Sequence, residues 1–283
     1  KNPTIAALAA HTGHMGAAAY EPIRATPTQE HYPLSHTQKR FWIEDRLAGD
    51  ARYNMPAAFE LKQQIDESAL RRALTQLTDR HEILRTVFIE INGEPRQQVL
   101  DGIDVPLSSI DLGDAEDADA QTRAIVAEQN RTRFALDQAP LFRVALITRD
   151  GGPTVFILVM HHIIGDGWSM QIFYRELLAL YDAARSDRQS QLPPLEIQYR
   201  DYAVLQDGRD RTGDAQFWKV QLANLEGPLH LPHDKPQSAA TARRGERVIL
   251  ALSDECTEAL RALSRARVTT PANTLLALFK LFL

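Results

Sequence analysis

Two histidines, an aspartate and a glycine stand close together between an apolar run and an amphipathic run of the sequence. His161 and His162 follow the apolar run, and Asp166 and Gly167 precede the amphipathic one. A neutral imidazole can accept a proton at neutral pH, or a hydrogen bond from an amine. A carboxylate at this spacing can orient a ring, cap the following helix or hold an arginine. These residue types therefore suit general base chemistry or the orientation of an amine.

The flanking residues predict where these side chains lie. The run Val155–Met160 is rich in β-branched and large aliphatic residues and follows a turn-forming segment at 150–153, which predicts a buried strand leaving a hairpin. Because successive strand side chains point to opposite faces, we expect one histidine to pack internally and the other to face a cleft. An adjacent pair is a poor chelate for one metal ion, and no zinc-binding motif accompanies it. The alternative is that both histidines are buried and hydrogen-bonded at an ordinary turn.

Two arginines are candidates for holding this turn in shape. Arg80 ends a predicted helix capped by Asp66, and Arg85 lies in a predicted strand over 83–91. Each arginine could pair with an internal carboxylate, and Asp166 is a candidate partner, because a guanidinium can hold a carboxylate by two hydrogen bonds. Plain surface salt bridges are the alternative. Gly165 and Gly167 permit a positive φ and a close approach of the backbone.

Length and composition exclude several classes of protein. The chain has 283 residues, enough for one large or two moderate domains. Its net charge of −5 does not indicate binding to nucleic acid or to a membrane surface. No stretch approaches the ~18 uninterrupted apolar residues of a membrane span, and the first residues lack a signal-peptide pattern. The one cysteine, Cys256, rules out an internal disulfide and lies in a predicted helix. We therefore expect a cytoplasmic protein.

The remaining pattern alternates strands and helices. Strands are predicted over 57–61, 83–91, 96–100, 105–110, 141–148, 155–160 and 247–252. Helices are predicted over 35–47, 66–80, 168–185, 199–206, 214–225, 254–265 and 274–283, and through 125–129. Turns at Asn92-Gly93 and Gly151-Gly152 predict antiparallel hairpins. This order predicts an α+β fold in which a mixed β-sheet is flanked by helices.

Four segments resemble, in order, the signature motifs of one family. HHIIGDGWS (161–169) resembles the His-His-x-x-x-Asp-Gly motif of condensation domains in non-ribosomal peptide synthetases, which are related to chloramphenicol acetyltransferase. LSHTQKRFWIEDRL (34–47) resembles the family's first signature, RHEILRTVF (80–88) the second, and IQYRDYAVLQ (197–206) the one after the histidines. The residues after the Asp-Gly pair favour a condensation domain over an epimerisation domain.

The resemblance implies a fold and a domain order. We expect a chloramphenicol acetyltransferase-like two-layer sandwich, with residues 31–226 as the complete N-terminal lobe and 227–283 as the incomplete start of a C-terminal lobe. Residues 1–14 resemble the last helix of an upstream carrier domain, followed by a linker over 15–30. A native or vector-derived terminal helix is the alternative for 1–14. Because the family's active site lies between two lobes, we expect these 283 residues alone to be inactive.

The resemblance also implies a reaction and residue roles. The reaction is amide bond formation between a donor acyl or peptidyl thioester and the α-amine of an acceptor aminoacyl thioester. His162 is implied as the catalytic residue, either as general base or as the hydrogen-bond acceptor that orients the amine. A structural role in the active site is implied for His161, Asp166, Gly167, Arg80 and Arg85. The substrate-channel candidates are Trp168 and Ser169, with Trp168 as a wall residue.

The resemblance implies no metal and no directly bound cofactor, because phosphopantetheine is delivered covalently on carrier domains. The implied partners are an upstream donor carrier, a downstream acceptor carrier and an adjacent adenylation domain, with no nucleic acid and no membrane. Two other functions stay open: a catalytically silent module that docks carriers or recruits enzymes, and a stand-alone acyltransferase of the same superfamily. The sequence leaves both amino acids unidentified and favours an L-configured donor.

Overall fold

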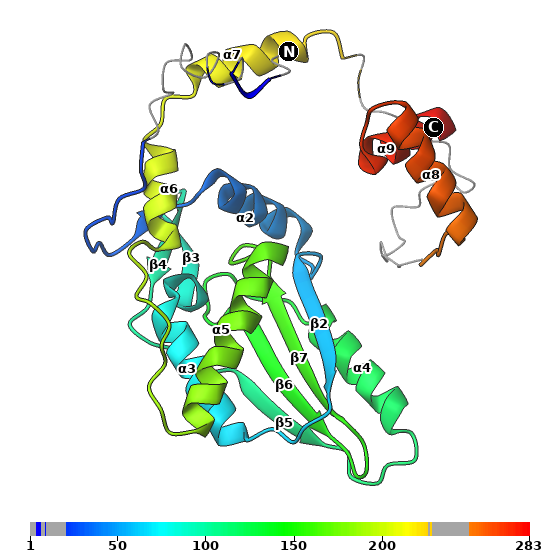
Figure 1. Ribbon diagram of the computed structural model, residues 1–283. Coiled ribbons are helices and arrows are strands. Elements are labelled where there is room, and N and C mark those ends of the chain that lie inside the picture. The colour runs from blue at the N-terminus through cyan, green and yellow to red at the C-terminus, as the bar shows by residue number, and fades with distance from the viewer. Residues whose placement is uncertain (1–3, 7–8, 10–20, 226, 228–248) are drawn as a thin grey trace. The chain divides into compact units, whose positions relative to one another are not determined.

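The computed structural model describes residues 4–6, 9, 21–225, 227 and 249–283 (Figure 1). The chain forms two compact units, Lys1–Asp210 and Arg211–Leu283. Most of the predicted helix over 1–14, and residues 15–20 of the predicted linker, lie outside the described residues. The histidine motif lies in the first unit.

A four-stranded mixed sheet forms the centre of the first unit. Its order is β2-β7-β6-β5, with β2 at Asn54–Leu61, β7 at Thr154–His161, β6 at Phe142–Thr148 and β5 at Leu107–Asp111. β7 pairs antiparallel with both β2 and β6, whereas β5 pairs parallel with β6. The predicted hairpin between β6 and β7 and the mixed character of the sheet are therefore confirmed. β2 begins three residues earlier than predicted, and its Pro56 is tolerated because β2 is an edge strand.

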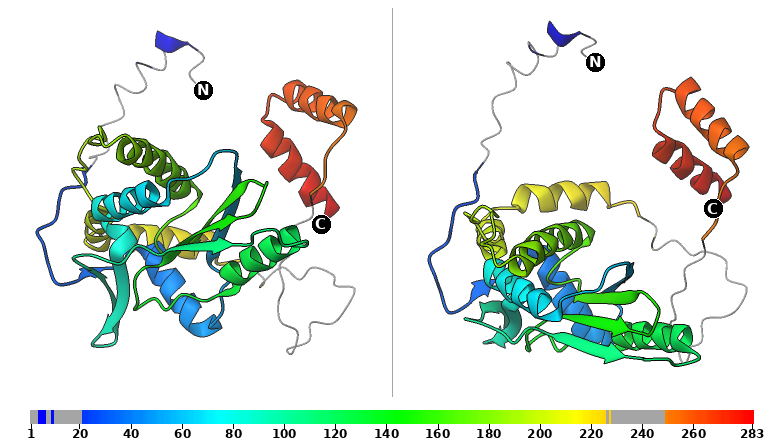
Figure 2. Two further views of the ribbon diagram at one scale, coloured as in Figure 1. Left: turned by 90° about the horizontal axis from the view of Figure 1, so that it is seen from below. Right: turned by 60° about the horizontal axis from the view of Figure 1, so that its bottom comes forward.

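Helices cover both faces of this sheet. Every residue of β7 from Val155 to His161 is buried, and side chains of alternating positions point to opposite faces, so both faces of the sheet are covered at β7. α3 (Glu67–Arg80) and α5 (Gly167–Arg185) pack side by side on one face, and α4 (Ala118–Arg131) lies on the other (Figure 2). The α+β architecture of packed layers is thus the predicted one.

A second, three-stranded sheet has the order β1-β4-β3, with β1 at Tyr32–Pro33, β4 at Glu94–Val99 and β3 at Thr86–Ile91. Asn92 and Gly93 join β3 to β4 with φ of 53° and 81°, as expected for the predicted hairpin turn. The predicted strand over 83–91 begins too early, because residues Glu82–Arg85 form the 3₁₀ turn η1. There the Leu84 amide donates to the His81 carbonyl at 3.0 Å, a local bond that a strand cannot make.

Two further helices of the first unit lie next to each other. α2 (His36–Ala48) is capped by Ser35, as predicted, and α6 (Tyr199–Asp207) contacts its N-terminal end. The Ser35 hydroxyl lies 3.0 Å from the Tyr199 hydroxyl. The segment 21–31 is held to α6 as well, because the Thr26 amide donates to the buried carboxylate of Asp201 at 2.9 Å.

The second unit contains α7 (Thr212–Gln221), α8 (Asp254–Ala266) and α9 (Pro271–Phe282). α8 and α9 pack against each other, and the hydroxyls of Ser264 and Thr274 lie 2.8 Å apart in their interface. Residues 249–252 of the predicted strand are not in a strand, and 247–248 lie outside the described residues. Cys256 is a free thiol on α8, as predicted from its helical context. No helix in the described ranges has the length and apolarity that a membrane crossing needs.

Candidate active site

The histidine motif is the turn that joins β7 to α5. β7 ends at His161, and α5 begins at Gly167. Asp166 is the N-cap of α5, since its carboxylate accepts hydrogen bonds from the Ser169 amide at 2.8 Å and from the Ser169 hydroxyl at 2.7 Å. The Ser169 hydroxyl and amide hold the pKa of the Asp166 carboxyl below its ordinary value, so the cap carries a negative charge. Of the three roles considered for Asp166, helix capping is the one that the structure contains.

The first histidine belongs to the interior. The His161 side chain is buried, and its Nδ1 accepts a hydrogen bond from the Ile163 amide at 3.1 Å. Its Nε2 lies 3.9 Å from the buried carboxylate of Asp45, which also accepts from Arg133 at 2.7 Å. Burial lowers the pKa of His161 to about 4, so the ring is neutral at neutral pH. His161 therefore connects the end of β7 to α2 without facing a substrate.

The second histidine is only half buried. Its ring stacks on Phe41 of α2, with the ring centroids 4.8 Å apart and the planes at 27°. The backbone amide of His162 donates to the Tyr53 carbonyl at 2.8 Å. Nδ1 is buried without a hydrogen-bond partner, which leaves Nε2 as the nitrogen that can meet a small molecule. The two neighbouring histidines thus have opposite environments, as strand geometry predicts.

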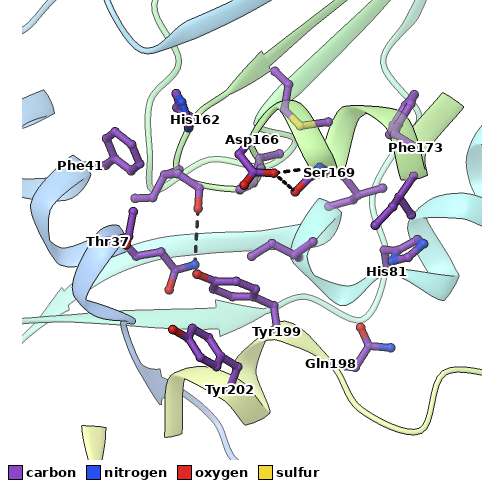
Figure 3. A pocket seen from close by; sticks show the side chains of 18 of the residues that line it. Thr37, Phe41, His81, His162, Asp166, Ser169, Phe173, Gln198, Tyr199 and Tyr202 are labelled. Atoms are coloured by element: carbon purple, nitrogen blue, oxygen red, sulfur yellow. Dashed lines mark hydrogen bonds between the residues drawn. The ribbon is translucent and has the colours of Figure 1, made fainter. Parts of the chain in front are cut away.

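His162 lines a cavity of about 600 Å³, referred to below as the His162 cavity (Figure 3). Its walls come from α2, His81 after α3, η1, the end of β7, the motif turn, the start of α5, and α6 with the segment before it. This volume lies in the usual range of small-molecule sites. The alternative that both histidines are sealed in the core does not hold for His162, because this residue is only half buried and lines the cavity.

Sequence reasoning about the site missed the contribution of α2. The Gln38 side chain donates from Nε2 to the Ile163 carbonyl at 3.4 Å, and this bond is drawn in Figure 3. Gln38 and Phe41 together fix the backbone and the ring of the motif from one helix. Both lie in the segment LSHTQKRFWIEDRL, so the four-segment pattern had marked the right helix without showing which side chains touch the histidines.

The proposed pairing of Arg80 or Arg85 with Asp166 was wrong. Arg80 donates from Nε to Glu176 at 2.9 Å, and Arg85 donates to the Leu100 carbonyl and lies 3.9 Å from Glu82. Glu176 lies farther along α5, roughly 15 Å from Asp166 along the helix axis at ~1.5 Å per residue. Asp166 is instead satisfied by the helix that it caps. Arg80 connects α3 to α5, and Arg85 connects η1 to the residue after β4. Neither arginine is hydrogen-bonded to the motif turn.

Glu176 is the acceptor that joins α3 to α5. It is 6% exposed and accepts from both Arg80 and the Nε2 of His81, the latter at 2.7 Å. Burial alone raises the pKa of the Glu176 carboxyl, but the hydrogen bonds from His81 and Arg80 outweigh it and leave that pKa lowered. The group is therefore a buried, hydrogen-bonded anion, and it contacts His81, which lines the His162 cavity.

The close approach that glycine permits is found at Gly165 but not at Gly167, and the expectation that Trp168 is a wall residue is wrong. Neither Gly165 nor Gly167 has a positive φ. A Cβ on Gly165 would lie 2.7 Å from the Met160 sulfur, whereas a Cβ on Gly167 would meet open space. Close packing against the buried Met160 side chain therefore favours glycine at 165. Trp168 is 72% exposed and does not line the His162 cavity, whereas Ser169 does.

The arrangement can accept a proton or a hydrogen bond at one exposed imidazole nitrogen, beside a cavity held by a capped helix. In the described part of the chain, no three His, Cys, Asp or Glu side chains are grouped so that they could hold a metal ion. These residues can carry the chemistry of an imidazole acting on a molecule in the cavity.

Comparison with known proteins identifies the family. A family model described as Condensation domain matches residues 28–283. Malpinin synthetase of Mortierella alpina is 36% identical over 250 residues, covering 87% of this chain and 3% of the relative. Phosphinothricin tripeptide synthetase PhsC of Streptomyces viridochromogenes is 36% identical over 254 residues, covering 87% of this chain and 23% of the relative. The chain thus spans a small part of the length of its curated relatives.

Solved structures show the same fold. The X-domain from teicoplanin biosynthesis has a TM-score of 0.74 and 28% identity, over 88% of this chain and 56% of that chain. SgcC5 protein from Streptomyces globisporus has a TM-score of 0.66 and 26% identity, over 88% of this chain and 59% of that one. Together with the matched family model, these similarities show that the chain belongs to the condensation domain family of non-ribosomal peptide synthetases, with its chloramphenicol acetyltransferase-like fold.

Proposed function

We propose that this chain carries the catalytic histidine of a domain that forms an amide bond between a donor acyl or peptidyl thioester and the α-amine of an acceptor aminoacyl thioester. The observation that supports this proposal most is His162, whose Nε2 is left open beside a cavity of about 600 Å³. Both substrates would arrive on the phosphopantetheine arms of carrier domains, one upstream and one downstream. An adenylation domain would load the acceptor carrier, and no cofactor would be bound by this chain itself.

In the proposed reaction, the acceptor amine attacks the thioester carbonyl carbon of the donor. A C–N bond forms, the C–S bond breaks, and the proton lost by the amine reaches the departing sulfur as a thiol. His162 Nε2 either takes that proton in transit or orients the neutral amine by a hydrogen bond. A general base contributes about 10²–10⁴-fold to the rate, and holding the two reactants in place contributes much of the rest.

The other motif residues would keep His162 in place. His161 anchors the end of β7 in the core, and Asp166 fixes the start of α5 by capping it. Gly167 borders open space, which would leave room for the thioester arm. Arg80 and Arg85 would hold α3, η1 and β4 around the cavity, acting through Glu176 and the Leu100 carbonyl rather than on substrate.

Replacing His162 with alanine tests this proposal. We expect transfer from a loaded donor carrier to a loaded acceptor carrier, measured by intact mass in the full-length protein, to fall by about 10²–10⁴-fold. The His162→Gln variant separates the two roles, because glutamine accepts a hydrogen bond but not a proton. The matched control is His36→Ala, at an exposed position on α2 outside the cavity. Transfer by His162→Ala within about threefold of the wild type would refute the proposal.

A second candidate function is a silent recruitment module. The observation that favours it is the similarity to the X-domain from teicoplanin biosynthesis, which has also been solved in complex with OxyB. A recruitment module would bind its partner equally well in the wild type and in His162→Ala, and neither protein would transfer an acyl group. The two functions are therefore separated by whether the wild-type protein forms the amide product at all.

A further inference from the structure

We infer that the His162 cavity takes the side chain of the acceptor amino acid and selects an apolar side chain. This inference rests on the proposed function, because it assigns a substrate class to the same site. It follows from three features of the cavity: its wall, the state of its polar groups, and its position relative to His162.

The wall of the cavity is largely apolar. Ile83 and Leu84 of η1, Ile172 and Phe173 of α5, and Leu195 of the segment before α6 contribute aliphatic and aromatic surface. Leu84 and Phe173 are 5% and 4% exposed, so they belong equally to the core and do not move freely. A rigid wall of this kind favours an apolar guest, since burying apolar surface stabilises the complex.

The two amide side chains of the wall are already engaged with the protein. Gln38 bonds to the Ser35 amide and the Ile163 carbonyl. Gln198 accepts from the Glu82 amide at 3.2 Å and donates to the Arg80 carbonyl at 3.0 Å. A polar side chain entering the cavity would lose its water and find these groups occupied, and an unpaired buried polar group is costly.

The charged groups in the depth of the cavity are likewise already paired with one another. His81 meets Glu176 at 2.7 Å, and Arg80 meets the same carboxylate. The other charged residues that line the cavity are Arg40 and Asp166, which are exposed and of opposite sign. Neither an acidic nor a basic side chain would therefore find a free counter-charge in the depth of the cavity. A neutral, apolar guest fits this wall best.

The position of His162 decides between acceptor and donor. In the proposed function, His162 contacts the amine of the acceptor. The side chain of an α-amino acid branches from the carbon next to that amine, so it lies beside His162 as well. The donor side chain branches from the carbon next to the attacked carbonyl, one bond farther from the amine. The acceptor side chain is therefore the nearer of the two to the apolar wall of the cavity that His162 lines.

The first experiment measures acceptor selectivity in the full-length protein. Acceptors are offered as N-acetylcysteamine thioesters of leucine, phenylalanine, alanine, asparagine and glutamate, with one loaded donor carrier. We expect kcat/KM for leucine to exceed that for asparagine, a side chain of similar size, by at least about 10-fold, because discrimination by apolar burial in enzyme sites has this magnitude. Equal kcat/KM for leucine and asparagine would overturn the inference.

The second experiment changes the acceptor preference by placing a charged residue in the cavity wall. Ile172→Lys places a cation in the wall, so we expect the glutamate-to-leucine ratio of kcat/KM to rise by about 10-fold or more. Leu178→Lys is the matched control, because Leu178 lies on the same helix, is 62% exposed and does not line the cavity. Ile197→Lys gives a second test at a wall position that is 39% exposed and tolerates a charge if the first variant does not fold.

Failure of the inferred acceptor selectivity can be distinguished experimentally from failure of the proposed catalytic function. An unchanged ratio in both wall variants overturns the acceptor assignment, and so does a change in selectivity for the donor side chain instead. Failure of the proposed function appears elsewhere, as transfer that survives His162→Ala. A protein that loses transfer in His162→Ala yet accepts every side chain equally would keep the catalytic role of His162 and lose only the inferred selectivity.

Discussion

The Glu176→Gln substitution is expected to remove a large part of the stability of the first unit. The carboxylate is 6% exposed and receives Arg80 at 2.9 Å and His81 at 2.7 Å. Glutamine keeps the shape but not the charge, so Arg80 stays charged beside a neutral group. Removing one partner of a buried ion pair costs about 3–5 kcal/mol. Because the Arg80 and His81 side chains are 15% and 20% exposed, we expect the lower end, about 3 kcal/mol.

The pH dependence of this loss has a definite sign. The pKa of Glu176 is lowered in the folded protein, so its contribution is complete above the ordinary pKa of 4.5 and disappears as the pH falls through the lowered value. The difference in unfolding free energy between wild type and Glu176→Gln should therefore be constant above about pH 5.5 and should shrink in stronger acid.

Urea unfolding followed by far-UV circular dichroism measures the difference, and hydrogen exchange of the α3 and α5 amides shows whether the loss is local. Glu67→Gln is the control, since Glu67 pairs with Arg71 at 3.2 Å on the surface of α3, where both side chains are 45% exposed or more. That change should cost less than about 1 kcal/mol. A loss of less than about 1 kcal/mol for Glu176→Gln, equal to the control, would refute the reasoning.

Three further outcomes are expected from the motif turn, each measured by urea unfolding. Gly165→Ala should destabilise the protein by about 1–3 kcal/mol, since its Cβ would lie 2.7 Å from the Met160 sulfur, whereas Gly167→Ala should not destabilise it. The unfolding free energy of the wild type should fall by about 3 kcal/mol from pH 6.5 to 4. The reason is that the pKa of His161 is about 4 in the folded protein, so the unfolded chain binds more protons between these pH values. The His161→Gln variant should lack this fall. Asp166→Ala should cost about 1 kcal/mol and Asp166→Asn much less, because asparagine also caps helices; equal losses would contradict the capping role.

The elements that carry the motif could be predicted from local pattern. The apolar run at 155–160 and the helical spacing after Trp168 predicted the ends of β7 and α5 to within a residue. Both elements are bounded by polar turn residues. The burial of β7 on both faces and of α5 on one face gives each a distinct apolar pattern. Alternation along a strand also predicted that the two histidines differ in environment. These are short-range properties, and a single sequence contains them.

The contacts that hold the motif are long-range and could not be predicted. The Arg80 partner, Glu176, is 96 residues away along the chain, and several other carboxylates were equally available. Phe41 stacks on His162 because α2 crosses the end of β7, and the order of elements does not reveal that. The need for glycine at 165 likewise arises from Met160 and Ser169, whose positions depend on the folded turn.

The contrast between the adjacent histidines has a consequence for genetics. A change at His161 acts through folding, so a second mutation that stabilises the protein elsewhere should restore function, and low growth temperature should help as well. A change at His162 leaves the core intact, so neither a stabilising suppressor nor a lower temperature should compensate for it. Neighbouring codons would then give two separate classes of mutant, one suppressible and one not.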